Sequence, residues 1–345
     1  MISRARILSL LLLPTMTQAA NYTAERTTAE GMAVVRLADS STGTEVWIAP
    51  SMGNNAYQMK VKGASVLWSP YKTLAEWKAK PVQLGNPLLA PWANRIDQTA
   101  YYANGKKYLL NEGLNNFRKD ANQLPIHGLL VFASEWEVTS VAADERGAYT
   151  TSRLEFWRNP DWMAQFPFAH SMEMTHRLRD GVLEVETMVE NLSSQPMPVS
   201  LGYHTYYQIT DAPRDAWQVE VGAKQSVVLS NVLVPTGETH PASLSRPLKL
   251  EGTQLDDVFT ALERGADGRA KFSVQGKKQK ISVEYGPLYT VSVVYAPKGR
   301  DFICFEPMSG VTNAFNLGHA GKFPLQTIPV GGRWRESFWI RPSGF

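Results

Sequence analysis

Glu306 is a residue whose type and sequence context could support proton transfer. It follows the apolar residues 302–305, where the period of two in a strand places it on the same face as Cys304. Burial there would raise the pKa of the carboxyl toward the range that suits a general base. The alternative is a glutamate that reaches solvent where Pro307 ends the strand, and the local pattern by itself favours that alternative.

His204 is a second candidate, because imidazole titrates near neutrality and can deliver a proton to an oxygen atom. It stands among Tyr203, Tyr206 and Tyr207, whose rings could stack on a sugar or an aromatic ligand. The alternative is a core histidine that hydrogen-bonds to the backbone, and the frequent burial of histidine favours that alternative.

Other polar residues could hold a ligand. Asn94 and Arg95 follow Trp92 and offer an amide and a guanidinium that suit several hydroxyl groups. The alternative for Arg95 is a surface arginine packed on the indole of Trp92. His127 follows Pro125 and is expected on a loop.

The neighbouring acids Asp256 and Asp257 are a further pair of candidates. If residues 255–259 are extended, their two carboxylates lie on opposite faces, so they cannot both enter one site. Periodicity does not choose between them, and either could be a plain turn acid.

A metal site built from His127, His204 and Glu306 has suitable ligand types, but these residues show no ligand-like spacing, so no metal is expected. The sequence also lacks the Gly-x-x-x-x-Gly-Lys, His-Glu-x-x-His and Gly-x-Ser-x-Gly motifs. Nucleotide hydrolysis, zinc proteolysis and serine esterase activity are therefore disfavoured.

The elements that must position these residues are mostly strands. Alternation of apolar and polar residues runs through 172–178 and continues through 183–190 after the turn residues Asp180 and Gly181, which predicts a hairpin. Further strands are predicted at 219–221, 227–229, 281–285, 289–295, 302–305 and 337–340. A second hairpin is predicted around 104–105, where Asn-Gly separates two tyrosine-containing runs.

One strand and one helix complete the expected elements. The strand at 56–62 is predicted to place Tyr57, Met59 and Val61 on one face. A short helix is predicted at 74–80. No linker or internal repeat is visible, so the sequence predicts an all-β fold made of a single large antiparallel sandwich.

The composition is that of a folded, soluble protein, with 345 residues, 43% apolar residues and a formal net charge of +3. Disorder and collagen are excluded, and the single cysteine, Cys304, excludes a disulfide scaffold. No basic run indicates nucleic acid or an anionic membrane as a partner.

Residues 1–20 are predicted to be a secretory signal peptide. Two arginines precede the apolar residues 7–13, and small residues lead to a cleavage site after Ala19 or Ala20. The apolar run is shorter than the ~20 residues of a membrane-spanning helix. We therefore expect a secreted or periplasmic protein with no membrane attachment after cleavage, whose domain is 21–345. Loss of the two arginines lowers the net charge from +3 to +1.

Five segments taken in order resemble the aldose 1-epimerase (mutarotase) family, and the match extends over most of the chain. These segments are 85–96, 126–130, 202–204, 255–259 and 305–307. Five motifs in register are far more specific than any one of them. The resemblance implies a β-supersandwich of the galactose mutarotase type that binds a free hexose such as glucose or galactose.

The resemblance also implies a role for each candidate. Glu306 would be the general base that takes the proton of the C1 hydroxyl, and His204 the general acid that protonates the ring oxygen as the ring opens. Rotation about C1–C2 and reclosure would exchange the α and β anomers without a cofactor or a covalent intermediate. The residues that would hold the sugar are Asn94, Arg95, His127 and Asp256.

Two alternatives share this scaffold. One is a non-catalytic carbohydrate-binding protein, which the presence of both Glu306 and His204 disfavours. The other is a hexose-phosphate 1-epimerase, which would need a cationic pocket beyond Arg95. We expect a monomer or a weak dimer.

Overall fold

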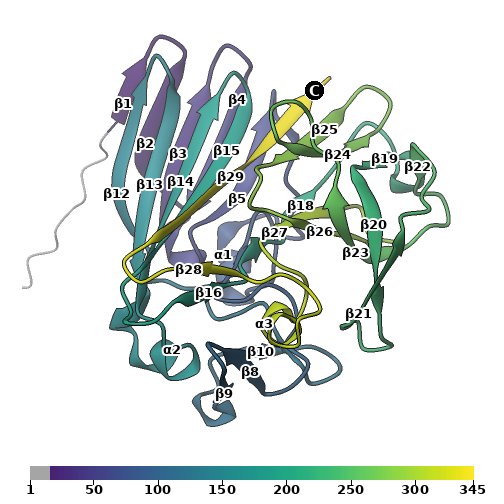
Figure 1. Ribbon diagram of the computed structural model, residues 1–345. Helices are drawn as coiled ribbons and strands as arrows, with labels where there is room; N and C mark the ends of the chain where they lie inside the picture. Colours follow the sequence, from purple (N-terminus) through teal and green to yellow (C-terminus); the bar gives the residue numbers. More distant parts are fainter. Residues whose placement is uncertain (1–15) are drawn as a thin grey trace, which may run out of the picture.

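The structure is a computed structural model, and it describes residues 16–345. Within this range the strands form three large sheets and three two-stranded ladders (Figure 1). Neighbouring strands run antiparallel in each large sheet, as in the pairs β2–β3, β14–β15 and β26–β27. The all-β fold predicted from the sequence is therefore confirmed.

A six-stranded sheet is formed by the first part of the described chain. Its strands, in spatial order, are β1 (Met16–Ala19), β2 (Tyr22–Ala29), β3 (Met32–Asp39), β4 (Thr44–Ala49), β5 (Asn55–Val61) and β6 (Ala64–Ser65). This sheet lies against the first strands of the next sheet (Figure 1).

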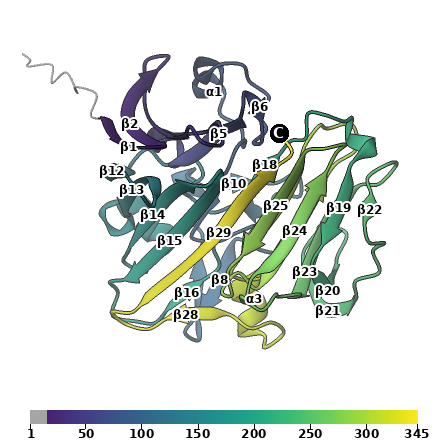
Figure 2. The ribbon, with the colours of Figure 1, turned by 90° about the horizontal axis from the view of Figure 1, so that it is seen from above.

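A nine-stranded sheet forms the long central layer, and Figure 2 shows its order across the molecule. Its strands, in spatial order, are β12 (Glu137–Asp144), β13 (Gly147–Glu155), β14 (His170–Arg179), β15 (Val182–Asn191), β29 (Arg333–Ser343), β25 (Lys280–Tyr285), β24 (Ala270–Gln275), β19 (Gln218–Val221) and β22 (Leu248–Lys249).

An eight-stranded sheet packs on the second half of this layer, and it carries the candidate site. Its strands, in spatial order, are β21 (Pro235–Pro241), β20 (Ala223–Leu229), β23 (Leu255–Leu262), β26 (Val291–Ala296), β27 (Ile303–Met308), β17 (Gly202–Tyr203) and β7 (Leu88–Leu89), with β18 (Tyr206–Tyr207) also paired to β27. Phe305 of β27 meets Phe272 of β24, with 6.0 Å between ring centroids, so aromatic side chains fill the space between the two sheets.

Short elements connect the sheets. The ladders pair β8 (Ala100–Ala103) with β9 (Lys106–Leu109), β10 (Arg118–Lys119) with β11 (Pro125–Ile126), and β16 (Met197–Val199) with β28 (Gln326–Ile328). The α-helices of the described residues are α1 (Leu74–Ala79), α2 (Pro160–Gln165) and α3 (Ala314–His319), and the 3₁₀ turns are Pro50–Met52, Glu112–Leu114, Phe156–Arg158 and Arg214–Ala216. The helix predicted at 74–80 is α1, where the Thr73 side chain accepts a hydrogen bond from the Glu76 amide.

Both predicted hairpins are present, and local turn chemistry explains them. Leu178 pairs with Leu183 across the turn formed by Asp180 and Gly181, whose φ angles are 50° and 73°. A two-residue turn with positive φ at both positions matches the twist of the flanking strands, which is why Asp-Gly and Asn-Gly favour hairpins. The turn at 104–105 joins β8 to β9 in the same way.

The predicted face pattern of β5 is wrong at one position. Trp47 pairs with Gln58 while the next residue of β4 pairs with Ala56, so a bulge at Tyr57 interrupts the alternation. Met59 lies in the main core, whereas the ring of Tyr57 packs 6.0 Å from that of Trp77 in a separate cluster.

The predicted signal peptide lies mostly outside the described residues. Its last part, Met16–Ala19, is the exposed edge strand β1, which pairs with β2. The main core cluster begins at Tyr22 and extends to Ile340. Within residues 16–345, no helix is both long and apolar enough to cross a membrane.

Candidate active site

Strand β27 presents two different faces. Ile303 and Phe305 point into the main core, whereas Cys304 and Glu306 alternate onto the other face. Glu306 is only 1% exposed. The alternative in which this glutamate reaches solvent is therefore wrong, because the ladder continues past Glu306 and Pro307 still pairs with Ser292 of β26.

The register of β27 with its neighbouring segment places His204 opposite Glu306. On one side β27 pairs with β17 at Met308 and with β18 at Cys304, and these two contacts share one register although the residues between β17 and β18 belong to neither strand. The amide of His204 instead donates to the carbonyl of Pro87 at 3.1 Å. The imidazole Nε2 consequently lies 3.3 Å from Oε1 of Glu306.

The close approach of β17 to β27 requires glycine at position 202. A Cβ on Gly202 would lie 2.8 Å from the carbonyl oxygen of Pro307. Gly202 therefore sets the distance between the strand that leads to His204 and the strand that carries Glu306.

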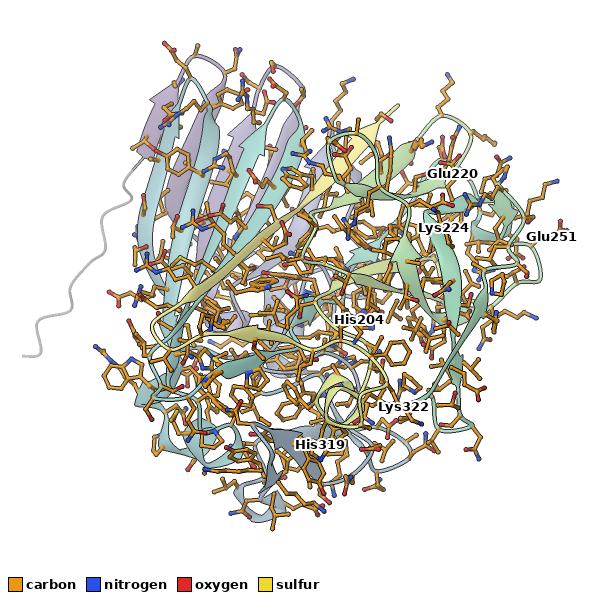
Figure 3. The ribbon with its side chains drawn as sticks, in the orientation of Figure 1. His204, Glu220, Lys224, Glu251, His319 and Lys322 are labelled. Carbon is orange, nitrogen blue, oxygen red and sulfur yellow. The ribbon has the colours of Figure 1, made fainter. Side chains whose placement is uncertain are left out.

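Two contacts position His204 and the chain segment that carries it. Tyr206 stacks on it with 4.7 Å between ring centroids and 19° between planes. The neighbouring Thr205 hydroxyl donates to the side-chain oxygen of Asn86, which ties this segment to the chain before β7. Figure 3 shows His204 toward the middle of the molecule, whereas Glu251 lies at its periphery.

The other two tyrosines near His204 in sequence are not at the site. Tyr203 and Tyr207 are both fully buried, and they pack on Phe338 and Phe305 of the core. The prediction of a stacking platform therefore applies to Tyr206 alone among these three phenols.

Asp256 reaches the site through a row of residues across neighbouring strands. It pairs with Tyr295 of β26, which in turn pairs with Cys304 of β27. Because paired residues share a face, Asp256 lies on the same face as Glu306, and the alternation places Asp257 on the opposite face. The prediction that the two carboxylates lie on opposite faces of one strand is confirmed by the register.

Asn94 and His127 come from two loops that run side by side. The carbonyl of Asn94 accepts a hydrogen bond from the amide of His127 at 3.0 Å. Both residues have positive φ, 57° and 65°, which is uncommon outside glycine. Gly128 follows with φ of 66°, and a Cβ there would lie 2.1 Å from the carbonyl oxygen of Ala90.

Arg95 is held by polar partners. Its Nε donates to Asp120 at 2.7 Å and its Nη1 donates to the side-chain oxygen of Asn94 at 3.0 Å. Trp92 is buried in the core, so the alternative of a surface arginine packed on this indole is wrong. Asp120 was not identified from the sequence, because the loop that carries it shows no pattern of its own.

The structure gathers the predicted site residues into one cluster. The rings of His127 and His204 are 5.4 Å apart and nearly perpendicular. Asn94, His127 and His204 are 5%, 7% and 8% exposed, whereas Asp256 is half-buried. Several buried polar atoms have no hydrogen-bond partner among the described residues, namely Oε2 of Glu306, Nδ1 of His204 and Nδ1 of His127. Such atoms are expected where a polar ligand binds.

Burial dominates the titration of the central pair. It raises the pKa of Glu306 well above its usual value, an effect that the charge of Asp256 increases. It lowers the pKa of His204 to about 3, an effect to which Arg118 and Arg95 contribute. Burial also lowers the pKa of His127 well below its usual value. Arg118, an exposed residue of β10, was not identified from the sequence.

One group of possible metal ligands lies at this site. The ligand atoms of His204, Cys304 and Glu306 all lie within 4.8 Å of one another. The trio considered from the sequence contained His127 in place of Cys304. Sequence reasoning noted only that Cys304 shares a face with Glu306.

Comparison with known proteins identifies the family. A family model described as aldose 1-epimerase matches residues 42–341. The chain belongs to the aldose 1-epimerase family. The resemblance inferred from five motifs is therefore confirmed, and the family places this epimerase among isomerases that act on sugars.

A curated relative and two solved structures are similar to this epimerase. The uncharacterized protein YihR of Escherichia coli strain K12 is 24% identical over 237 residues, which are 67% of this chain and 71% of YihR. A galactose mutarotase-like protein from Clostridium acetobutylicum has a TM-score of 0.79 and 20% identity, with 97% of this chain and 99% of that chain covered. Galactose 1-epimerase from Lactobacillus acidophilus has a TM-score of 0.72 and 12% identity, with 97% and 100% covered. These two structures establish the shared mutarotase-type fold.

Proposed function

We propose that this protein is an aldose 1-epimerase that interconverts the α and β anomers of a free hexose. The observation that carries the proposal is the contact between His204 and Glu306, a buried acid and base 3.3 Å apart. Each of them also has a second polar atom that is buried and has no hydrogen-bond partner within residues 16–345. Ring opening needs a base and an acid near the anomeric carbon, and this pair supplies both.

The reaction conserves the protons of the pair. Glu306 as carboxylate takes the proton of the C1 hydroxyl, C1 becomes the aldehyde carbon, and the C1–O5 bond breaks. His204 as imidazolium delivers its proton to O5. Rotation about C1–C2 and the reverse transfers then close the ring on the other face. The pair therefore carries one proton before ring opening and one after it, so turnover leaves the enzyme unchanged.

The pKa shifts indicate where that proton rests. The raised pKa of Glu306 and the lowered pKa of His204 favour the neutral pair, with the proton on the carboxyl, when the site holds no sugar. The neutral pair is also the state that ring opening produces. Transfer of one proton over this contact converts it to the ion pair that begins the reaction, and that transfer changes no net charge in the buried site.

Four neighbours are proposed to hold the sugar. Arg95 is fixed by Asp120, and its remaining guanidinium N–H groups can donate to hydroxyl oxygens. Asp256 accepts hydrogen bonds from hydroxyls at the half-buried edge of the cluster. The full set is Asn94, Arg95, His127 and Asp256.

The two alternatives make different demands on the site. A binding-only protein does not need a buried acid–base pair, so the pair at His204 and Glu306 favours catalysis. A phosphorylated hexose would need cations near the pair that are not already neutralised. Arg118 of β10, whose charge contributes to the lowered pKa values of His204 and His127, is such a cation among the described residues, so the assay with phosphorylated sugars decides this alternative. A hollow of about 670 Å³ that contains arginines lies beside Trp339, on the face of the nine-stranded sheet away from the core. Each of its arginines is paired with a carboxylate, namely Arg146, Arg177, Arg179, Arg269 and Arg341.

Location and assembly are part of the same proposal. The signal-like residues 1–20 support export to the periplasm or the medium. No cofactor is needed, because acid–base ring opening changes no oxidation state. A monomer or weak dimer suffices, because the proposed groups all come from one chain.

Polarimetry tests the proposal. Freshly dissolved α-D-glucose and α-D-galactose change optical rotation as they equilibrate, and the purified mature protein should accelerate that change in proportion to its concentration. Saturable binding of either sugar without acceleration would favour the binding-only alternative. Acceleration confined to hexose phosphates would favour the alternative of a hexose-phosphate 1-epimerase.

A further inference from the structure

Cys304 brings a third kind of ligand to the acid–base pair. It lies two residues before Glu306 on the same face of β27, and its backbone pairs with Tyr206, the residue that stacks on His204. Its thiol is fully buried. The ligand atoms of His204, Cys304 and Glu306 consequently lie within 4.8 Å of one another.

This trio is the donor set that zinc prefers. Imidazole nitrogen, thiolate sulfur and carboxylate oxygen bind Zn²⁺ at ~2.0–2.3 Å in tetrahedral sites. Tetrahedral ligands at such lengths are ~3.5 Å apart. The 3.3 Å between Nε2 of His204 and Oε1 of Glu306 already fits this spacing. The sulfur of Cys304 lies no more than 4.8 Å from the other two ligand atoms, so it fits after a movement of about an ångström.

A second observation indicates that the site can accept a ligand. Oε2 of Glu306 is buried and has no hydrogen-bond partner among the described residues. Glu306 is only 1% exposed, so solvent water does not satisfy the hydrogen-bonding capacity of this carboxylate oxygen. Coordination of a cation would satisfy that capacity.

We propose that His204, Cys304 and Glu306 form a binding site for a thiophilic divalent cation such as Zn²⁺, and that the bound cation inhibits the epimerase. Binding forms Zn–S, Zn–N and Zn–O bonds and releases two protons, one from the thiol and one from the His204–Glu306 pair. The resulting site contains Zn²⁺, a thiolate and a carboxylate, so its charge is balanced.

Inhibition follows from the occupied atoms. The cation takes the lone pair of His204 and the carboxylate of Glu306, so neither group can move a proton to or from the sugar. Sugar and cation therefore compete for one site. This inhibitory part rests on the proposed function, whereas the binding of the cation does not.

The composition of the chain makes the site easy to observe. Cys304 is the only cysteine of the 345 residues. Any thiolate-to-metal charge-transfer absorption that appears when Cd²⁺ is added must therefore come from this residue. We expect the band to saturate at one Cd²⁺ per chain, and we expect added Zn²⁺ to abolish it by displacement.

Variants separate the site from non-specific binding. Zn²⁺ affinity is measured with a competing chromophoric chelator for wild type, Cys304→Ala, Cys304→Ser and Ile303→Val. The two Cys304 variants should bind at least ~10-fold more weakly, because loss of a direct ligand costs no less than loss of a supporting group. Ile303→Val alters the opposite face of the same strand and should retain the affinity. Circular dichroism checks that each variant is folded, and Cys304→Ser serves if Cys304→Ala is not.

The measurements test the metal site, its inhibitory role and the proposed function separately. Absence of the Cd²⁺ band, or equal Zn²⁺ affinity in wild type and both folded Cys304 variants, overturns the metal site whatever the activity. Inhibition is measured for each protein relative to its own rate with a chelator present, and wild type should lose activity at Zn²⁺ concentrations that leave the Cys304 variants active. Activation by Zn²⁺ would overturn the inhibitory role. If no sugar is epimerised, the proposed function fails, and the absorption and affinity still decide the site.

Discussion

Nε2 of His204 lies 3.3 Å from Oε1 of Glu306, although the two residues come from different segments and different sequence motifs. The strands on either side of His204, β17 and β18, pair with β27 at Met308 and at Cys304 in one continuous register, and this register places His204 opposite Glu306. Residues opposite each other share a face of a sheet, so the register creates the acid–base pair.

Glu306→Gln should lower kcat by at least the ~100-fold expected for loss of one general base, because the amide keeps the shape but cannot accept the proton. Sugar affinity should change much less. Glu336→Gln is the matched control, since Glu336 is also buried but accepts hydrogen bonds from the backbone amides of Ser337 and Leu288. Polarimetric rates of both variants check this, and near wild-type turnover in Glu306→Gln would remove Glu306 from the mechanism.

Asp256→Ala should raise KM about ten- to a hundredfold. A charge-assisted hydrogen bond to a sugar hydroxyl in a largely dry site is worth ~1.5–3 kcal/mol. Asp257→Ala should change KM little, because Asp257 lies on the opposite face of β23. The Michaelis constants of the two variants decide the matter. A large effect confined to Asp257→Ala would show that the assignment of the sugar-facing acid is wrong.

The kcat/KM value should not fall as the pH decreases from about 6.5 to 5, because the pair must carry one proton and its internal transfer is independent of pH. A second proton adds to His204, whose pKa is lowered from 6.5 to about 3, so activity falls only well below pH 5. The last proton leaves the pair above the usual range of a glutamate, since the pKa of Glu306 is raised. A loss of activity on acidification with a midpoint near 6.5, in protein still folded by circular dichroism, would contradict this assignment.

His176 should make the fold sensitive to mild acid. It is fully buried in β14, neither ring nitrogen has a partner among the described residues, and burial lowers its pKa from 6.5 to about 3. The unfolded chain therefore binds the extra proton below about pH 6.5, so stability falls as the pH decreases toward 3. Between about pH 6.5 and pH 5 the loss is ~2 kcal/mol.

His176→Leu should remove the contribution of His176 and so reduce the pH dependence, while His170 and His204, whose pKa values burial lowers to about 4 and about 3, keep theirs. The free energy of unfolding of the variant should exceed the wild-type value by more at pH 5 than at pH 7.5. Urea titrations at the two pH values measure the difference. His240→Leu, at an exposed position of β21, is the control and should retain the wild-type dependence. An unchanged pH dependence in His176→Leu would assign the acid sensitivity elsewhere.

The mature protein should begin at Ala20 or Asn21, because a short apolar core followed by small residues is typical of a cleaved signal peptide. Cleavage there removes β1 and leaves β2 as the edge of its sheet. Mass spectrometry of the exported protein measures the terminus directly, and retention of Met1 would contradict the prediction.

Local patterns in the sequence determined much of the fold. The hairpins at Asp180-Gly181 and Asn104-Gly105 follow from turn chemistry that involves only neighbouring residues. The shared face of Cys304 and Glu306 follows from the period of two in a strand. The separation of Asp256 from Asp257 has the same origin. Five motifs together were enough to identify the family.

Only the tertiary structure decided which side chains are in contact and which of them are buried from solvent. The burial of Glu306 depends on the strands that flank β27, the pairing of Arg95 with Asp120 depends on where a loop lies, and the bulge at Tyr57 depends on the register with β4. Local patterns carry no information about these, because register and loop position are set by packing between segments far apart in the chain. The same packing brought Cys304 to the acid–base pair and placed four site neighbours around it.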